Sequence, residues 1–152
     1  MSAIDIARLT LADAHDLAPL VAAYTQDRKR GAPRRPDEYY AERLLSDRAA
    51  ELLGARQGDR LVGFAVFFDL PDTMTGMRAG QLDELYVDHD ARGRGIGRAL
   101  VEALASEGRR RGWTHLRWMV PKKPASAGRL AESLAEPGDW ANYAIRIERP
   151  AG

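Results

Sequence analysis

The residues with the clearest chemical potential lie within the stretch 81–107. Two adjacent carboxylates, Asp83 and Glu84, precede a turn in which arginines and glycines alternate. Glycines let a backbone approach a ligand closely, and a helix that starts beside them points free N–H groups at an anion. Arginine adds charge-assisted bonds to phosphate oxygens. The pattern predicts a polyphosphate site beside a pair of titratable groups. Its residues are Arg92, Gly93, Arg94, Gly95, Ile96, Gly97 and Arg98.

The turn is predicted to connect a strand to a helix. The run from Leu82 to Val87 has aromatic and β-branched residues near its end and is bounded by a polar cluster, which indicates a strand. After the turn, Ile96, Leu100 and Leu104 recur at four-residue spacing, which is typical of one helix face. A strand, a glycine turn and a helix in this order form a phosphate-binding arrangement.

The spacing of the glycines separates this turn from better-known phosphate loops. It reads R-x-x-G-x-G from Arg92 to Gly97, and matches neither G-x-x-x-x-G-K-[ST] nor G-x-G-x-x-G. A basic surface turn or an RG-rich nucleic-acid segment is the alternative, but such segments are repetitive and this one is not. Placed after L-D-E-L-Y-V, the pattern resembles the acyl-coenzyme A motif of the GNAT (Gcn5-related N-acetyltransferase) family.

The resemblance covers nearly the whole chain and implies a mixed α/β fold. The expected GNAT fold has a mixed central sheet of about six to seven strands flanked by about four helices. Its sheet splays open between the motif strand and the next strand to admit coenzyme A. The pattern along the chain predicts strands at 3–9, 51–56, 61–70, 82–87, 115–120 and 140–148, and helices at about 13–25, 36–47, 96–108 or 96–112, and 127–135.

The resemblance also implies acetyl-coenzyme A as the cosubstrate and no metal. Backbone groups at the end of the motif strand would bond the pantetheine arm and the acetyl oxygen, and the turn would bind the pyrophosphate. The three histidines (His15, His89 and His115) are scattered without metal-ligand spacing. The expected cofactor-binding residues are therefore Leu85, Tyr86 and Val87, followed by Arg92 through Arg98.

Acetyl transfer needs a neutral amine, a polarised thioester carbonyl and a proton for the departing thiolate. Adjacent strand residues point to opposite faces, so Asp83 and Glu84 are separate candidates for the base. The strand resembles L-E-D-[FL]-[FY]-V of polyamine acetyltransferases, whose proposed catalytic glutamate falls on Asp83. Glu84 is the alternative.

The usual thiolate acid of the family is missing at its position. The N-x-x-A-x-x-x-Y pattern falls on the stretch from Pro124 to Ala131, so proline replaces the asparagine and alanine replaces the tyrosine. Tyr143, on the strand expected over 140–148, is a substitute candidate, and water is another.

The expected acceptor is a small primary amine rather than a protein lysine. Besides the polyamine-type strand, the stretch before it could bring Asp69 and Asp72 close to the two candidate bases and attract a cation. The basic segment 26–37 is predicted to be a loop, either a connector or a lid that would repel a polycation. The alternatives are an acetyltransferase for protein, peptide or amino-acid amines, and a degenerate domain that binds acetyl-coenzyme A without turnover.

Length and composition limit the classes of protein to which the chain can belong. A chain of 152 residues suits one domain, 1–152. The net charge of +1 gives no general field for nucleic acid, although arginines cluster at 28–35 and 109–111. The sequence lacks cysteine, a signal-peptide pattern and an apolar run long enough for a membrane span. These features predict a cytoplasmic enzyme, and Trp118 and Trp140 suggest contact area for a homodimer.

Overall fold

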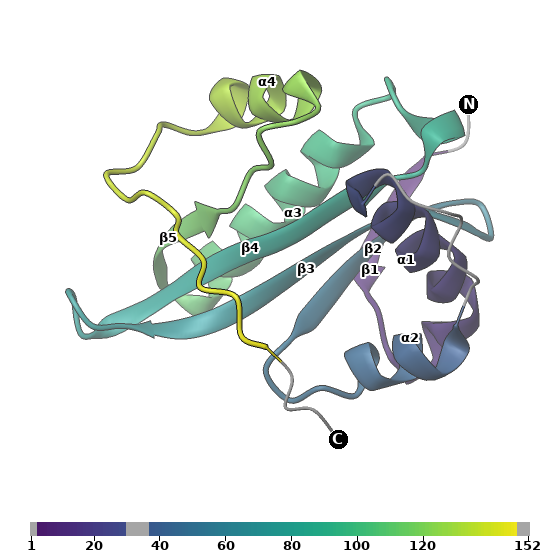
Figure 1. The fold of residues 1–152 in the computed structure, drawn as a ribbon, viewed down its shortest axis with the longest axis horizontal. Coiled ribbons are helices and arrows are strands. Elements are labelled where there is room, and N and C mark those ends of the chain that lie inside the picture. Colours follow the sequence, from purple (N-terminus) through teal and green to yellow (C-terminus); the bar gives the residue numbers. More distant parts are fainter. Residues whose placement is uncertain (1–2, 30–36, 149–152) are drawn as a thin grey trace. The chain divides into compact units, whose positions relative to one another are not determined.

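The computed structural model describes residues 3–29 and 37–148 (Figure 1). The chain divides into two compact units, Met1–Val120 and Pro121–Gly152. In the described residues, the second unit contains one helix, α4 (Ala125–Leu134). The first unit contains β1 (Ile4–Arg8), η1 (Leu11–Asp13), α1 (Ala14–Lys29), α2 (Glu38–Leu45), β2 (Glu51–Gln57), β3 (Arg60–Asp72), β4 (Met77–Val87), η2 (His89–Ala91), α3 (Ile96–Arg111) and β5 (Trp113–Trp118).

The five strands form one mixed sheet in the order β1-β2-β3-β4-β5. The first four strands pair antiparallel with their neighbours, and β5 runs parallel to β4. Every residue of β3 from Leu61 to Phe67 is buried. In the strand predicted at 61–70, Val62, Phe64 and Val66 alternate with the apolar Ala65 and Phe67, and a strand that is apolar on both faces must be covered on both sides.

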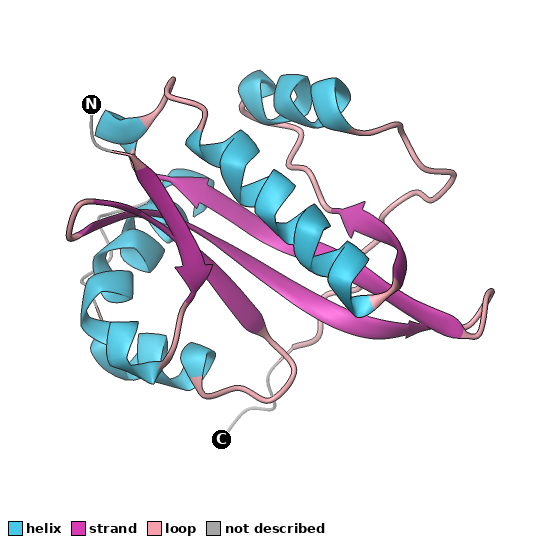
Figure 2. Cartoon of the chain, turned by 180° about the vertical axis from the view of Figure 1, so that it is seen from behind, coloured by secondary structure: helices cyan, strands magenta, loops and turns pink. Residues whose placement is uncertain are grey.

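Helices cover both faces of the sheet (Figures 1 and 2). On one face, α1 and α2 pack over a core cluster that includes Leu17, Phe64, Val66 and Tyr86. On the other face lies α3, whose buried residues Ile96, Leu100, Val101, Leu104 and Gly108 continue the four-residue spacing seen in the sequence. The predicted helix and its buried face are confirmed.

The end of α3 is fixed by a glycine. The sequence left Gly108 and Gly112 as alternatives, and the helix ends at Arg111 with Gly112 as its C-cap at φ 81°. A left-handed conformation at this position favours glycine, because glycine carries no Cβ. Gly108 instead lies within the helix, where a Cβ would come within 2.4 Å of Trp113 Cε3.

Three sequence predictions differ from the structure. The strands predicted at 61–70 and 82–87 imply a loop over 71–80, but β3 continues to Asp72, β4 begins at Met77 and only a short turn joins them. The predicted loop at 26–37 is helical through Lys29, and its part 30–36 lies outside the described residues.

The predicted strand at 140–148 is the third difference, so the described chain has five strands rather than six or seven. Its apolar residues alternate as in a strand, but Trp140, Tyr143, Ile145 and Ile147 are 84–89% exposed. A strand is defined by hydrogen bonds to a neighbour, and an alternating pattern without such a partner does not stabilise one.

Candidate functional site

The site begins where β4 and β5 separate. Their parallel pairing ends with Leu82 opposite Trp118, while β4 continues to Val87 and stays paired with β3 on its other side. Beyond Leu82, the β5 side of β4 therefore faces no strand of the described chain. The backbone of this open edge can bond a ligand as a neighbouring strand would. It contains the three predicted backbone ligands, Leu85, Tyr86 and Val87.

The glycine turn leads from this edge to the start of α3. Gly93 and Gly95 both have φ 78°, a left-handed conformation that glycine adopts without strain, and Gly95 is the N-cap of α3. The first hydrogen bond within the helix runs from the Ala99 N–H to the Gly95 carbonyl, at 3.0 Å. The N–H groups before it have no partner within the helix, and together with the helix dipole they favour an anion. They belong to Ile96, Gly97 and Arg98.

Arg92 is held by contacts with β4 and α1. Its Nε donates to the Val87 carbonyl at 2.9 Å, and its Nη2 lies 3.0 Å from Asp27 Oδ2. The guanidinium lies over the Tyr86 ring, 5.4 Å from the ring centroid. These contacts tie the turn to the two elements beside it. The sequence proposed Arg92 only as a phosphate ligand and gave no signal for its pairing with Asp27, which lies in a segment predicted to be a loop.

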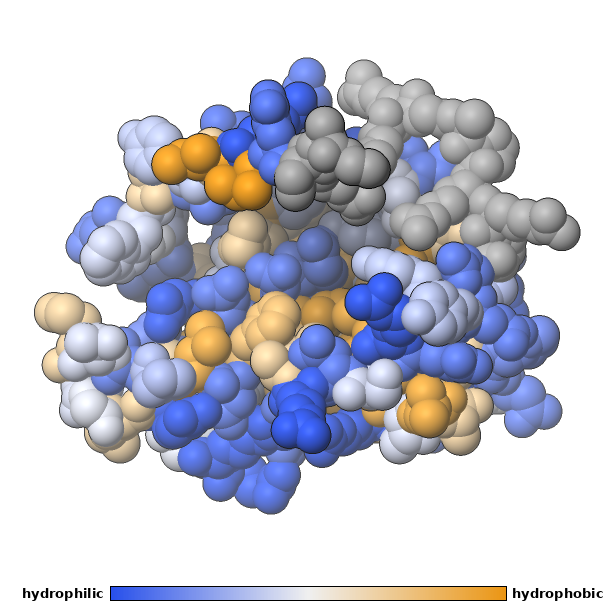
Figure 3. All heavy atoms as spheres, turned by 60° about the horizontal axis from the view of Figure 1, so that its bottom comes forward, coloured by the Kyte–Doolittle hydropathy of each residue, from blue (hydrophilic) through white to orange (hydrophobic). Residues whose placement is uncertain are grey.

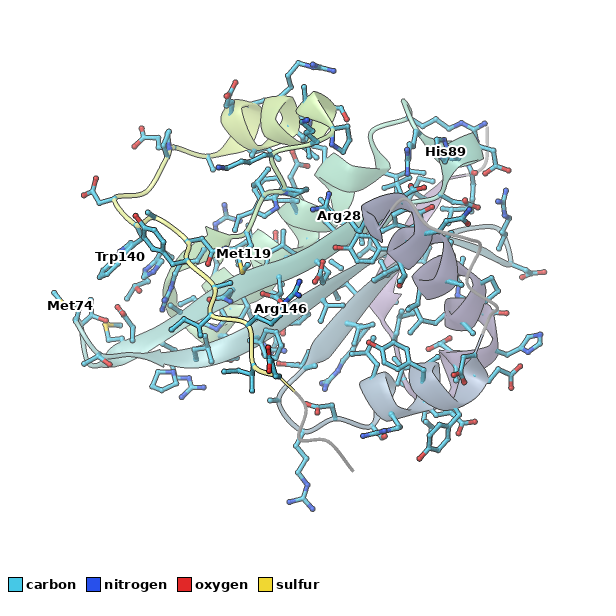
Figure 4. The ribbon with its side chains drawn as sticks, viewed as in Figure 1. Arg28, Met74, His89, Met119, Trp140 and Arg146 are labelled. Atoms are coloured by element: carbon cyan, nitrogen blue, oxygen red, sulfur yellow. The ribbon has the colours of Figure 1, made fainter. Side chains whose placement is uncertain are left out.

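The other two arginines of the motif lie at the exposed start of α3. Arg94 Nη1 donates to Gln57 Oε1 at 3.1 Å, and Arg98 Nη1 lies 3.8 Å from Glu102 Oε1. Figure 4 shows His89 beyond the end of β4, far from Met74 at the tip of the β3–β4 hairpin. The positive groups of the motif thus gather at the end of the sheet that carries the glycine turn.

A β-bulge determines where the two candidate bases point. Glu84 lies opposite Val66, and one step along β3 corresponds to two steps along β4, which leaves Asp83 as the extra residue. Val66 belongs to the core cluster beneath α1. Gln81, opposite Phe68 on the same face, donates to Asp83 Oδ1 at 3.3 Å. The bulge therefore places both carboxylates on the α1 face, whereas simple alternation predicted opposite faces.

The Glu84 carboxyl is half-buried beside a group of aromatic rings. The Tyr24 hydroxyl on α1 donates a hydrogen bond to Glu84 Oε2. The Tyr24 ring packs against Phe64 and Tyr86, with ring centroids 6.0 and 5.6 Å away. Burial raises the pKa of Glu84 above its usual value. A carboxylate with a raised pKa accepts a proton more readily than an unperturbed one.

The helix predicted at about 13–25 contains Tyr24, whose spacing from Leu17 and Val21 places it on the apolar face, but sequence reasoning missed its hydroxyl. The position is correct, since Tyr24 packs against the core cluster. A buried tyrosine hydroxyl requires a hydrogen-bond partner, and this requirement was the available signal.

The predicted cluster of four carboxylates does not hold in the structure. Asp69 Oδ1 lies 2.8 Å from Arg78 Nε, and Asp69 Oδ2 lies 3.2 Å from Arg111 Nη1. Asp72 accepts a hydrogen bond from the Thr75 hydroxyl at 2.7 Å within the hairpin. The charge of Asp69 is thus matched by arginines instead of being available to a cationic substrate.

The candidates for the thiolate acid lie in the second unit. Pro124 is the N-cap of α4 and Ala131 lies within that helix. Tyr143 lies outside any strand and is 89% exposed, so the strand that was expected to present it is absent. Its role stays a prediction.

Two further findings concern metals and membranes. Across residues 3–29 and 37–148, no group of three or more His, Cys, Asp or Glu side chains could hold a metal ion. None of the helices in the same ranges is long and apolar enough to cross a bilayer. Hydrophilic residues dominate the face shown in Figure 3, with smaller apolar areas between them.

The arrangement fits acetyl-coenzyme A on two observations. The open edge of β4 offers backbone donors and acceptors to an extended amide-containing chain, and the start of α3 offers N–H groups to a pyrophosphate. β4 ends at Val87 and α3 begins at Ile96, and the connecting residues 88–95 contain η2 and the glycine turn. One elongated ligand can therefore reach both features.

Comparisons with known proteins place the chain in a family. The model of the acetyltransferase (GNAT) family matches residues 17–133. A crystal structure of a ribosomal-protein-alanine N-acetyltransferase from Brucella melitensis biovar Abortus 2308 is 50% identical, with 96% of this chain and 100% of that chain covered and a TM-score of 0.87. No curated protein matches the sequence.

More distant structures share the fold. An aminoglycoside acetyltransferase from an uncultured soil metagenomic sample, solved in complex with sisomicin, is 18% identical over 95% of this chain and 97% of that chain, with a TM-score of 0.80. A transcriptional regulator from Bacillus halodurans is 23% identical over 95% and 100%, with a TM-score of 0.82. The family model matches more than half of this chain, and the Brucella structure is 50% identical over 96% of it. The chain therefore belongs to the GNAT family of acetyltransferases.

Proposed function

We propose that the protein transfers the acetyl group of acetyl-coenzyme A to a primary amine by direct attack on the thioester. The open edge of β4, continuous with the free N–H groups at the start of α3, is the observation that carries the proposal. Neither a serine or cysteine nucleophile nor a covalent enzyme intermediate is needed, because the thioester is already activated.

The chain's own groups have defined tasks in this reaction. The start of α3 binds the pyrophosphate, and the backbone from Leu85 to Val87 aligns the pantetheine arm and polarises the acetyl carbonyl. At about 3.3 Å per residue, the strand from Val87 back to Glu84 spans roughly 10 Å, so an arm lying along it brings the thioester towards the bulge. One of the two carboxylates there, Asp83 or Glu84, accepts the proton of the amine.

For the acceptor, we place the α-amine of a peptide first. The 50% identity to a ribosomal-protein-alanine N-acetyltransferase over nearly the full chain supports this class. A small-molecule primary amine is the second candidate, supported by the L-D-E-L-Y-V strand and its two carboxylates on one face. The ion pairs of Asp69 weaken the argument for a polycation.

A thiol-release assay distinguishes these possibilities. Acetyl-coenzyme A is supplied with short peptides that begin with alanine, with the same peptides blocked by N-terminal acetylation, and with a set of small amines and diamines. We expect thiol release with the free peptides and only background release with the blocked ones. A preference for small amines would reverse our order of acceptors. Tight binding of acetyl-coenzyme A without release for any amine would instead identify a binding domain without turnover.

The cellular setting remains a proposal drawn from the sequence. We propose a cytoplasmic homodimer, in keeping with the absence of cysteine and the exposure of Trp140.

A further inference from the structure

We propose that Glu84 is the general base of acetyl transfer and that Tyr24 is a positioning residue that orients its carboxylate. This inference rests on the proposed function and assigns a role that the sequence left open between Asp83 and Glu84. The two carboxylates differ in their place at the bulge and in the side chains that contact them.

The bulge separates the two carboxylates by environment. Both lie on the α1 face, but Asp83 is the unpaired residue and accepts from the Gln81 side chain at 3.3 Å. Glu84 accepts from the Tyr24 hydroxyl on α1 and lies opposite Val66. The Glu84 carboxyl is half-buried, and burial raises its pKa. A base with a raised pKa is the stronger proton acceptor among carboxylates.

The aromatic rings fix the hydroxyl of Tyr24 in place. Tyr24 meets the Phe64 ring edge-on, with an interplanar angle of 90°, and the Tyr86 ring at 58°. Phe64 and Tyr86 are 1% and 5% exposed and face each other across β3 and β4. A ring enclosed by two such partners has few alternative positions, so its hydroxyl holds the acceptor carboxylate in one orientation.

Among the described residues, charged side chains on α1 and β4 have to be considered beside the pair. On α1, Asp27 pairs with Arg92, and Arg28 follows it in the sequence. On β4, Asp83 is the nearest carboxylate, while β3 presents the apolar side chains of Phe64 and Val66. Burial is therefore the cause of the raised pKa, and the hydrogen bond from Tyr24 opposes it by stabilising the carboxylate.

The proposed step transfers one acetyl group from sulfur to nitrogen and one proton from the amine to the protein. The amine nitrogen forms a bond to the acetyl carbon, the bond from that carbon to sulfur breaks, and the proton of the amine moves to the carboxylate of Glu84. The thiolate takes a proton from water, and Glu84 returns its proton to solvent. The hydroxyl of Tyr24 stays protonated throughout and only donates its hydrogen bond.

The first test compares pH profiles of kcat/KM for the wild type and Tyr24→Phe with the best amine acceptor. Loss of the donor destabilises the carboxylate, so the acid limb of the profile should move to higher pH by about one unit, which corresponds to about 1.4 kcal/mol. Activity should fall about tenfold on the acid side and recover at high pH. A uniform loss at every pH would indicate only a structural role and would overturn the positioning assignment. The control is Tyr39→Phe, which removes a hydroxyl from a side chain that is 68% exposed and should leave the profile unchanged.

The second test separates the two carboxylates. Glu84→Gln should lower kcat about 100-fold or more and remove the acid limb due to the base, and Tyr24→Phe should add no further loss in that background. Asp83→Asn should retain most of the activity. If Asp83→Asn abolishes turnover and Glu84→Gln does not, Asp83 is the base and our assignment is wrong, while the proposed function stands.

A third measurement does not depend on turnover. Carboxyl carbon chemical shifts of Glu84, followed by NMR as the pH is varied, should give a pKa that is raised in the wild type and raised further in Tyr24→Phe. An unchanged titration in the variant would contradict the hydrogen bond as the source of the orientation. If the wild type acetylates no amine, the proposed function fails and Glu84 has no role as a base, whatever its titration.

Discussion

The glycine N-cap of α3 provides the sharpest test of the cofactor site. A Cβ added at Gly95 meets no atom within 4 Å, so a side chain there extends into open space beside the free N–H groups of the first turn. We predict that Gly95→Glu places a carboxylate where the pyrophosphate binds. The perturbation therefore opposes binding by charge and by occupation of space, while the interior of the protein stays undisturbed.

The magnitude has two parts. The φ of 78° at Gly95 is strained for any residue with a Cβ, which costs about 1–2 kcal/mol of folding stability and lowers Tm by roughly 2–8 °C. For binding, two unit charges about 6 Å apart at an effective dielectric constant of about 20 repel by roughly 3 kcal/mol, which raises the Kd for acetyl-coenzyme A about 100-fold. Because this site is exposed, added salt should recover part of the loss.

Titration calorimetry measures the Kd, and Gly76→Glu is the matched control. Gly76 has φ 70°, and a Cβ there also meets no atom within 4 Å, but it lies in the turn between β3 and β4, at the hairpin tip far from the glycine turn (Figure 4). Both variants should lose similar stability, and only Gly95→Glu should lose affinity. Equal affinities in the two folded variants would refute the assignment of the pyrophosphate to the start of α3.

Two further predictions concern the stability of the fold. Gly80→Ala should lower stability by about 1–3 kcal/mol in a melting experiment, because its Cβ would come within 2.2 Å of Trp113 Cζ3, in a ring that cannot move freely. Hydrogen bonds from Arg110 and Arg111 lower the pKa of Glu107 from 4.5 to about 2. The unfolded chain therefore takes up the proton first as pH falls, so the stability that Glu107 contributes is complete above pH 4.5 and is lost towards pH 2.

Each of these predictions has its own control. Gly128→Ala, in α4, adds a Cβ that meets nothing within 4 Å and should leave the melting temperature unchanged or slightly higher. A loss equal to that of Gly80→Ala would contradict the steric explanation. Glu107→Gln should be less stable than the wild type at pH 7, and the difference should shrink on acidification. A difference that grows as pH falls would contradict the ion pairing.

Local patterns predicted most of the fold. The buried face of α3 follows from Ile96, Leu100 and Leu104, and the central position of β3 follows from a run that is apolar on both faces. The predicted connection between β3 and β4 was too long. Turn residues such as Gly76 indicate that the chain reverses direction, but they do not show how far the paired strands extend. The strand predicted at 140–148 was wrong for a related reason, because alternating apolar residues do not show whether a neighbouring strand is there to pair with.

The candidate site likewise has some features that neighbouring residues predict and others that depend on residues far away in the sequence. A glycine turn and a helix start can be recognised from neighbouring residues, so the sequence alone could place the turn at Gly93 and Gly95. The direction of Asp83 depends on a bulge, which arises from the register of β4 against β3 and therefore from residues far away in the sequence. The contact between Tyr24 and Glu84 spans 60 positions in the chain and could be predicted only as an unmet need of a buried hydroxyl.

This division also explains why the donor is easier to infer than the acceptor. Acetyl-coenzyme A is expected to contact backbone groups of β4 and α3, whose positions depend on the strand edge and helix start and tolerate many side chains. In the proposed mechanism the acceptor meets side chains on the α1 face, among them Glu84 and Tyr24, and such side chains differ between enzymes that share a fold. Similarity of fold to an aminoglycoside acetyltransferase at 18% identity therefore carries no acceptor assignment. Acceptor choice should accordingly change with substitutions on the α1 face and stay constant with substitutions in the glycine turn, which should alter only the affinity for the donor.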